Sequence, residues 1–405
     1  MAKKEKLTLQ QELERRKVKI PNPIFYFAYR VLAGIISLPY KHKIKVIDSP
    51  KDCKGPCFVI WNHLSRRDYL FLNIACYPRR FNMLAGYNEF FRSHLAFLFK
   101  LVNVIPKKNF SNDMVSIAGM HRIIKAGGLI AFSPEGSSSY YGDQQPIVPG
   151  TGKFLKHYGV PIYCMDLRGA YLTSHKVNIT DRPGKVEATL YRLFSAEDLK
   201  NMTADEIQDK INETFRHNDY EWNKEKRIKY RTKKLAASNY DDMIYKCPKC
   251  GEEFSIEAKG DTVKCTKCGN GMTIDDYYDL HPLNDDCLIP DTPTKWVEWE
   301  RCQIIKEIRE NPKYSFTRHC KIGYLPPDRL VKDKKVTSVI CGDGQITIDH
   351  DGLHFVGTKL GEPYQFDMNY KELYTINIEN DFKTGEIYVN GEMLDIYRDD
   401  EDPSW

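Results

Sequence analysis

A chain of 405 residues is longer than a typical single domain, so two or three domains are expected. Its 41% hydrophobic and 28% charged residues exclude a disordered or collagen-like protein. Residues 1–240 hold 40 Lys and Arg against 22 Asp and Glu, whereas residues 241–405 hold 20 against 33. The first part therefore attracts anionic partners such as phospholipid headgroups, nucleic acid or acidic carrier proteins, and the second repels them.

The N-terminal region combines basic residues with an apolar segment. Residues 1–20 are charged throughout and lack both an apolar core and a small-residue cleavage site, so we do not expect a secretory signal. Residues 24–40 form an apolar segment of 17 residues interrupted by Arg30, shorter than the roughly 20 that span a bilayer. Flanking Lys and Arg and several aromatic residues favour a helix in the headgroup region of an anionic membrane, within an N-terminal unit of residues 1–42. A buried core helix with basic ends is the alternative.

Residues 43–200 alternate between strand and helix patterns. The β-rich runs predict strands near residues 43–48, 57–62, 101–105, 129–133, 160–165 and 185–193. The longer patterns predict helices near residues 65–77, 88–99 and 111–126. Strands that alternate with helices indicate an α/β sheet flanked by helices. Two polar segments, 203–217 and 219–236, then predict a helical linker over residues 201–243.

Four of the 12 Cys form two C-x-x-C pairs with 14 residues between them, each pair followed by Gly. Four thiolates at this spacing suit tetrahedral zinc and leave no open position for catalysis, which predicts a structural zinc ribbon over residues 244–275 with the ligands Cys247, Cys250, Cys265 and Cys268. A redox disulfide is the alternative. The other eight Cys show no disulfide-like pattern, which favours a reducing cytoplasm.

The C-terminal region, residues 290–405, is expected to form a small, mostly β domain. A helix is predicted from Thr294 to about Glu310, and strands are predicted over residues 336–397, with turns at Asp351-Gly352 and Asn390-Gly391. The strands weakly resemble pleckstrin-homology or GRAM-like barrels, and an unrelated β-sandwich is the alternative. We expect a role in partner binding or regulation.

A polar motif follows the second predicted strand and precedes a predicted helix: Asn62, His63, Ser65 and Asp68. On a straight helix a His and an Asp five residues apart would point about 140° apart, so they meet only if the His lies on the turn. A neutral imidazole whose other nitrogen is held by a carboxylate is a general base for a hydroxyl. The alternative is a helix cap formed by Ser65 and Asp68, with His63 as a polar turn residue.

Two further segments are informative only together with this motif. Residues 132–139 follow an apolar strand and offer hydroxyls and backbone amides to an anion, although such Pro, Gly and Ser clusters usually mark loops. Residues 160–162 begin a strand and by themselves indicate packing.

In this order and spacing, the three segments resemble the glycerophospholipid acyltransferase family, most closely its 1-acylglycerol-3-phosphate acyltransferases. Asn62, His63, Ser65 and Asp68 match the family's N-H-x-S-x-x-D motif. Its F-P-E-G-T-R-S motif is echoed by Phe132-Ser133-Pro134-Glu135-Gly136-Ser137-Ser138-Ser139, and its V-P-I motif by Val160-Pro161-Ile162. The resemblance covers about residues 22–195 and includes the apolar N-terminal segment, because family members seat their active site on the membrane with such a helix.

The resemblance implies acyl transfer from acyl-CoA or an acylated carrier protein to the free hydroxyl of a lysophospholipid, giving phosphatidate, with no catalytic cofactor. His63 would be the base and Asp68 its orienting group. The substrate-binding residues it implies are Asn62, Ser65, Lys107, Lys108, Glu135, Gly136, Ser137 and Ser138. Lys107 or Lys108 would contact the acceptor phosphate.

The chain departs from the family pattern at one charged position. Ser138 replaces the Arg of the F-P-E-G-T-R-S motif, so one contact to the acceptor phosphate is missing or comes from elsewhere, for example from Lys107, Lys108 or Arg168. The additional residue Ser133 also lengthens this loop.

Three hypotheses follow. The leading one is a lysophosphatidate acyltransferase at the cytoplasmic face of the membrane. The second is an acyltransferase with another lysolipid or alcohol as acceptor, suggested by Ser138. The third is a zinc-ribbon adaptor with a disabled acyltransferase fold, in which basic residues 224–234 contact phosphates. The intact His63 and Asp68 oppose this adaptor, and the acidic flanks of the ribbon make nucleic acid an unfavourable partner.

Overall fold

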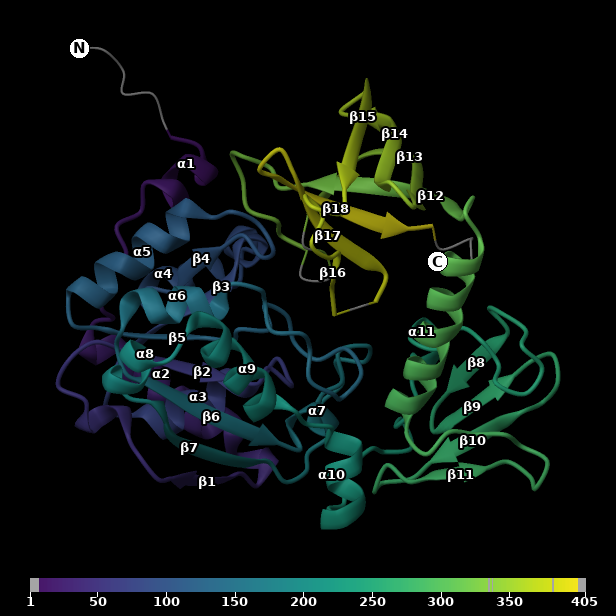
Figure 1. Ribbon diagram of the computed structural model, residues 1–405, viewed down its shortest axis with the longest axis horizontal. Helices are drawn as coiled ribbons and strands as arrows, with labels where there is room; N and C mark the ends of the chain where they lie inside the picture. Colours follow the sequence, from purple (N-terminus) through teal and green to yellow (C-terminus); the bar gives the residue numbers. More distant parts are fainter. Residues whose placement is uncertain (1–6, 334–335, 337, 381, 400–405) are drawn as a thin grey trace.

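The computed structural model describes residues 7–333, 336, 338–380 and 382–399. The ends of the predicted N-terminal unit and C-terminal domain, residues 1–6 and 400–405, lie outside the described residues. Figure 1 shows three parts: an α/β domain, a small four-stranded ribbon, and a seven-stranded β-domain that lies against the α/β domain. The predicted fold class is confirmed.

The α/β domain is built on a seven-stranded sheet with the order β1-β7-β6-β2-β5-β3-β4. Its strands are β1 (Lys43–Val46), β2 (Cys57–Trp61), β3 (Phe81–Gly86), β4 (Ile105–Lys107), β5 (Leu129–Phe132), β6 (Ile162–Arg168) and β7 (Glu187–Phe194). Neighbours run parallel, except that β6 and β7 are antiparallel. Because β2 and β5 are parallel neighbours with Ile60 opposite Phe132, the chain segments that follow them begin side by side.

The central strand β2 is buried on both faces of the sheet. Cys57, Val59 and Trp61 belong to one apolar core, whereas Phe58 and Ile60 belong to a second. Successive side chains of a strand point to opposite faces. One short apolar run therefore joins two cores, as expected for a parallel strand covered by helices on both sides.

Helices on both sides of the sheet complete these cores. The first core receives side chains from α2 (Pro23–Ser37), α3 (Asp68–Cys76), α7 (Ala170–Thr173) and α10 (Asp219–Lys226). The second receives them from α5 (Met114–Lys125), α6 (Thr151–Tyr158), α8 (Ala196–Asn201) and α9 (Ala204–Phe215). The short helices α1 (Leu9–Glu14) and α4 (Ala96–Leu101) contribute Leu13 and Phe99 to a smaller cluster.

Two predicted elements around β4 differ from the structure. The predicted strand over 101–105 is wrong in position, because α4 continues to Leu101 and β4 starts only at Ile105. The predicted helix over 88–99 is divided between a 3-10 turn, Tyr87–Phe91, and α4. The sequence patterns also do not predict β3 or α6.

The linker helix is shorter than predicted. The pattern over 219–236 predicts one helix, but α10 ends at Lys226 because Arg227 adopts a left-handed backbone conformation with φ of 54°. The preceding helix, α9, begins with a capping box, in which Thr203 and Glu206 exchange hydrogen bonds.

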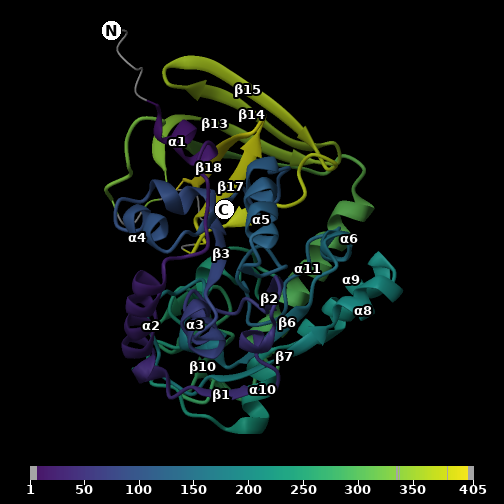
Figure 2. The ribbon, with the colours of Figure 1, turned by 90° about the vertical axis from the view of Figure 1, so that its left-hand side faces the viewer.

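Helix α2 presents an exposed apolar surface. The side chain of Asn22 caps its first turn, and Pro23 occupies the first helical position. Pro23–Tyr40 is the segment of the described residues that is long and apolar enough to cross a membrane, and 22% of it is buried. Tyr26 and Ala33 face the core, whereas seven apolar side chains are exposed: Ile24, Phe25, Phe27, Val31, Leu32, Ile35 and Leu38. Figure 2 shows α2 lying along α3 at one side of the molecule.

The ribbon contains four antiparallel strands: β8 (Ile256–Lys259), β9 (Thr262–Cys265), β10 (Gly271–Ile274) and β11 (Leu280–Pro282). Helix α11 (Pro293–Glu310) packs on it. The indole Nε1 of Trp296 donates to the carbonyl of Lys246 at 2.9 Å, and Glu300 accepts the backbone N–H groups of Tyr245 and Lys246 at 2.8 and 2.7 Å. In Figure 1, α11 runs from the ribbon towards the β-domain.

The β-domain is one antiparallel sheet with the order β15-β14-β13-β12-β18-β17-β16. Its strands are β12 (Ser315–Tyr324), β13 (Val339–Asp349), β14 (Gly352–Lys359), β15 (Glu362–Asn369), β16 (Asn377–Ile378), β17 (Thr384–Val389) and β18 (Glu392–Arg398). The predicted turn at Asn390-Gly391 is confirmed, with φ of 50° and 82° at the two residues. The likeness to pleckstrin-homology or GRAM-like barrels stays a prediction.

Candidate active site

The turn between β2 and α3 brings His63 and Asp68 together. Because β2 ends at Trp61 and α3 begins at Asp68, His63 lies outside both elements. The imidazole Nδ1 lies 2.8 Å from Asp68 Oδ2. The same oxygen accepts the backbone N–H groups of Leu64 and Ser65 at 2.9 and 3.0 Å. Asp68 therefore holds the imidazole and the backbone of the turn at the same time. Because no side chain caps the first turn of α3, the alternative of a helix cap formed by Ser65 and Asp68 is wrong.

The two side chains differ in exposure. Asp68 is 1% exposed, and the side chain of His63 is 29% exposed. Burial raises the pKa of Asp68, and the hydrogen bonds from His63, Ser65 and Leu64 oppose that rise. Because Nδ1 is held by Asp68, Nε2 is the nitrogen that can take a proton from a substrate.

Glu135 holds the backbone of the turn that carries His63. Its Oε2 accepts the backbone N–H of His63 at 2.5 Å, and its Oε1 accepts that of Gln145 at 3.0 Å. The carbonyl of His63 accepts the backbone N–H of Ser139 at 2.7 Å. Glu135 is 2% exposed, and this burial raises its pKa to about 8. In this structure Glu135 therefore positions His63, whereas the sequence predicted it to contact the acceptor.

Asn62 joins two strands. Its side-chain amide donates to the carbonyl of Leu167 at 2.8 Å and accepts the backbone N–H of Leu167 at 2.7 Å. It is 1% exposed. Asn62, predicted to bind substrate, therefore ties the end of β2 to β6 here. The hydroxyl of the buried Ser65 accepts the backbone N–H of Arg67 at 3.2 Å.

Two cavities meet at His63. The first has a volume of about 820 Å³ and the second of about 1240 Å³. Both are lined by the same short set of residues: Trp61, His63, Leu84, Ala85 and Gly86. His63 thus lies where the two cavities adjoin.

The loop after β5 contributes to both cavities. Gly136 lines the first cavity with φ of 74°, and a Cβ there would lie 2.9 Å from the ring of Phe110, so a glycine is required. Ser138 lines the second cavity. The Oγ of Ser137 accepts a hydrogen bond from Lys176 Nζ at 2.6 Å.

The cationic residues predicted for the phosphate take different positions. Lys107 lines the first cavity, but its Nζ donates to the carbonyls of Lys108 and Ser111 at 2.6 and 3.3 Å. Lys108 Nζ donates to the carbonyl of Gly391 in the β-domain at 2.9 Å. Arg168 forms an ion pair with Asp166 at 2.9 Å and lines neither of the two cavities.

Arg66 and Arg67, not predicted as site residues, line the second cavity. Each places a guanidinium nitrogen on one oxygen of Asp181, at 2.9 and 2.8 Å. Burial acts to raise the pKa of Asp181, but the hydrogen bonds and charges of the two arginines outweigh it and lower that pKa. Their position inside the N-H-x-S-x-x-D motif was the signal that could have found them.

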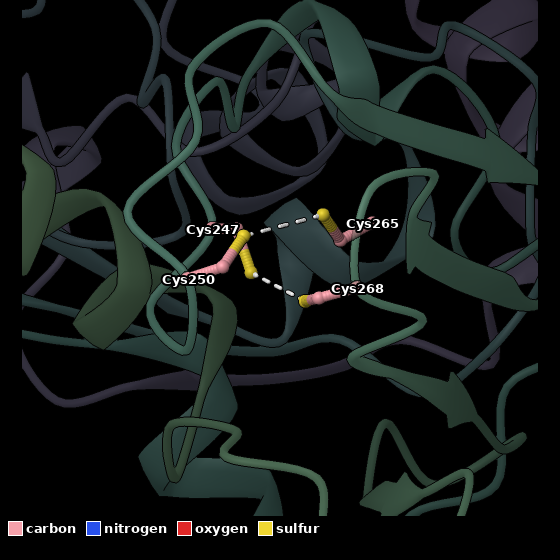
Figure 3. Close-up of side chains that lie close together, drawn as sticks. All are labelled: Cys247, Cys250, Cys265 and Cys268. Atoms are coloured by element: carbon pink, nitrogen blue, oxygen red, sulfur yellow. Dashed lines mark hydrogen bonds between the residues drawn. The ribbon is translucent and has the colours of Figure 1, made fainter.

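The four cysteines of the two C-x-x-C pairs converge, as Figure 3 shows. All four sulfurs lie within 4.8 Å of one another, with Sγ–Sγ distances of 3.6 Å for Cys247 and Cys268 and 3.8 Å for Cys250 and Cys265. Zn–S bonds of about 2.3 Å in a tetrahedron require sulfurs about 3.8 Å apart. Gly251 and Gly269 turn each knuckle with φ of 73° and 75°. The sulfur geometry therefore fits zinc.

Comparison with known families agrees with this description. Residues 40–167 match the model of the family described as Acyltransferase. Residues 240–271 match a zinc-ribbon model described as DNA directed RNA polymerase, 7 kDa subunit. The α/β domain is therefore an acyltransferase-family domain, and a zinc ribbon follows it in the chain.

Among solved structures, the chain is similar to the crystal structure of the 1-acyl-sn-glycerophosphate (LPA) acyltransferase, PlsC, from Thermotoga maritima. The match has 17% sequence identity and a TM-score of 0.39, and it covers 47% of this chain and 76% of that chain. No curated protein matches this chain. The family assignment rests on the sequence match of residues 40–167.

Proposed function

We propose that this chain is a membrane-associated acyltransferase that moves a fatty acyl group from a thioester to the free hydroxyl of 1-acylglycerol-3-phosphate, giving phosphatidate. The observation that carries the proposal is the His63–Asp68 pair at the junction of two cavities. Each substrate then has its own compartment, with the base between them.

The chemistry follows from this placement. His63 Nε2 removes the proton of the acceptor hydroxyl as its oxygen attacks the thioester carbonyl. Asp68 stabilises the imidazolium that forms. When the C–S bond breaks, the imidazolium returns the proton to the leaving thiolate, so the products are an ester and a free thiol. No cofactor takes part in this scheme.

The second cavity suits the anionic acceptor. Arg66 and Arg67 supply two guanidinium groups that match phosphate geometry, and in the complex the phosphate competes with Asp181 for them. The same cavity is bordered by Leu32 and Ile36 of α2. The exposed apolar side chains of this helix support its insertion into a membrane surface at the cytoplasmic face, which places the cavity beside the lipid.

The test is acyl transfer to lysophosphatidate from acyl-CoA and from an acylated carrier protein, in detergent, with zinc present. We expect His63→Ala to lose at least about 100-fold in rate. His121→Ala, an exposed histidine of α5, is the matched control and retains the wild-type rate. Equal activity of the His63→Ala variant and the wild type would contradict the proposal.

A second candidate differs only in the acceptor. Ser138 borders the second cavity where the family has Arg, which favours a lysolipid or alcohol with a smaller or uncharged head. The same assay distinguishes the two, because acylation of such an acceptor in preference to lysophosphatidate would support this candidate. A protein that acylates none of these acceptors would favour the adaptor.

We further propose that the four cysteines hold a structural zinc ion. The sulfur distances support it, and a fully cysteine-ligated tetrahedron leaves no position for substrate.

A further inference from the structure

The first cavity is shared between two domains. The α/β domain lines it with apolar side chains that include Met114, Ile117 and Phe132. The opposite wall comes from the β-domain: Met368, Leu373, Tyr374, Ile387 and Tyr388. A domain distant in sequence from the acyltransferase motifs thus closes a compartment that contains the base.

Specific contacts hold this wall in place. The ring of Tyr374 stacks on Phe110, with centroids 5.6 Å apart and an angle of 26°. The hydroxyl of Tyr140 donates to Asn377 Oδ1 at 3.3 Å and accepts the backbone N–H of Ile378 at 3.1 Å. Contacts before and within β16 therefore hold residues 374–378 against the α/β domain.

Two of the charged side chains that line this cavity are hydrogen-bonded to backbone groups. The Nζ of Lys107 donates to two backbone carbonyls. Asp113 caps α5 by accepting the backbone N–H of Ser116 at 3.0 Å. Glu386 is buried, and burial raises its pKa well above its usual range. Lys371 and Glu372 are exposed.

Several apolar side chains that line the first cavity are still exposed. Met114 is 71% exposed, Ile117 39% and Tyr374 45%, although all three face the same cavity. A group that covers them must be apolar, because each buried methylene strengthens binding roughly fourfold. The second cavity carries the arginines and borders α2, so it takes the membrane-held acceptor. Of the two substrates, only the thioester donor then remains for the first cavity. Its fatty acyl chain is the apolar group that would cover this lining.

We propose that Leu373 and Tyr374 of the β-domain wall the compartment for the transferred acyl chain and determine which chain length the protein uses. This inference rests on the proposed function and assigns to the β-domain a part of the substrate site. Leu373 and Tyr374 lie on the segment between β15 and β16, so their side chains can change without altering a strand.

Three variants of the full chain test the wall. Leu373→Trp fills the compartment, and we expect it to shift the ratio of medium-chain to long-chain use towards medium chains by about tenfold. Tyr374→Ala opens it and shifts the ratio the other way. Tyr374→Phe keeps the ring stacked on Phe110 and retains the wild-type ratio. The matched control is Tyr370→Ala, a 52% exposed tyrosine of the same domain that lies outside this lining.

Two readouts separate this inference from the function it rests on. The first is acyl transfer from thioesters of graded length, and the second is direct binding of non-hydrolysable acyl thioethers of the same lengths. If transfer occurs but Leu373→Trp and Tyr374→Ala match the wild type in both readouts, the wall is overturned and the function stands. If the variants shift thioether binding while no acceptor is acylated, the acyl-chain site stands and the proposed function fails. Absence of thioether binding at every length overturns the wall as well.

Discussion

At the scale of single residues, two carboxyl groups, those of Asp68 and Glu135, hold the histidine turn of the site. Asp68 Oδ2 binds the imidazole and two backbone N–H groups, and Glu135 holds the backbone of the same histidine. The turn is thus fixed by two buried carboxylates, one for its side chain and one for its main chain. A change at either is expected to move the base before it unfolds the domain.

Asp68→Asn tests this at the side chain. The asparagine oxygen can still accept the N–H groups of Leu64 and Ser65, so the turn before α3 keeps these hydrogen bonds. Its neutral amide does not stabilise an imidazolium, and we expect a loss of about 100- to 10000-fold in acyl transfer with little change in melting temperature. Asp198→Asn is the matched control, because Asp198 also accepts backbone N–H at a helix start and lies on α8. A large fall in the melting temperature of Asp68→Asn, with activity retained in the folded fraction, would show that Asp68 only holds the backbone of the turn.

At the scale of elements, α2 and the ribbon give separate predictions. For α2, Phe27→Ser with Ile35→Ser removes two side chains that are 56% and 60% exposed. If they insert into lipid, burial of each contributes about 2 kcal/mol, so binding to anionic vesicles should weaken by roughly 100-fold or more.

The matched control is Val356→Ser with Leu360→Ser, two apolar residues of the β-domain that are 64% and 63% exposed. We expect the control to bind vesicles as the wild type does, and detergent to release the wild type better than salt. Release by salt alone, with equal binding of both double variants, would argue against insertion of α2.

For the ribbon, Cys265→Ser removes one of the four converging sulfurs. We expect elemental analysis to find about one zinc per chain in the wild type and a greatly reduced amount in the variant, with faster proteolysis between β8 and α11. Cys302→Ala, an exposed cysteine of α11, is the control and retains both zinc and protease resistance. Full zinc content in Cys265→Ser would disprove this ligand set.

The elements also show which parts of the fold could be read from sequence. Strands β2 and β5 are uninterrupted apolar runs, and the parallel pairing of such strands brings their following loops together. Strand β3 escaped prediction because it contains the buried Asn82, whose amide donates to the carbonyls of Lys19 and Asn103, partners that only the folded chain supplies.

In the site, too, some features could be predicted from the sequence and others could not. The His63–Asp68 pair is local and could be predicted from its spacing. The bonds of Asn62 to Leu167 and the approach of Leu373 and Tyr374 to the first cavity depend on contacts between distant segments, which periodicity does not encode.

At the scale of the whole molecule, the basic residues 1–240 and the acidic residues 241–405 carry opposite net charge and contact each other at an interface. The basic first part meets the acidic second part, for example where Lys176 lies near the β-domain carboxylates Glu379 and Glu386. Opposite charge favours docking of the two parts in one orientation.

Lys176 gives this interface a pH dependence. The residue is 7% exposed, and burial lowers its pKa to about 7 although Glu379 and Glu386 act to raise it. The unfolded chain keeps this proton up to about pH 10.5. Between pH 7 and that value the unfolded state binds more protons, so this group makes stability rise with pH, by at most about 1.4 kcal/mol per unit.

Lys176→Met should therefore flatten the increase in the free energy of unfolding between pH 7 and pH 9.5, measured by urea denaturation. Lys313→Met, at an exposed position, should keep the wild-type slope. A Lys176→Met slope equal to that of the wild type would mean that the lysine keeps its charge in the folded protein.

The shared wall of the two cavities also bears on the steady-state kinetics. Because the two cavities share only five of their lining residues, a molecule in one leaves most of the other open. Under the proposed function, the thioester and the acceptor can then bind in either order and react within a ternary complex. Double-reciprocal plots at several fixed acceptor concentrations are expected to give lines that intersect.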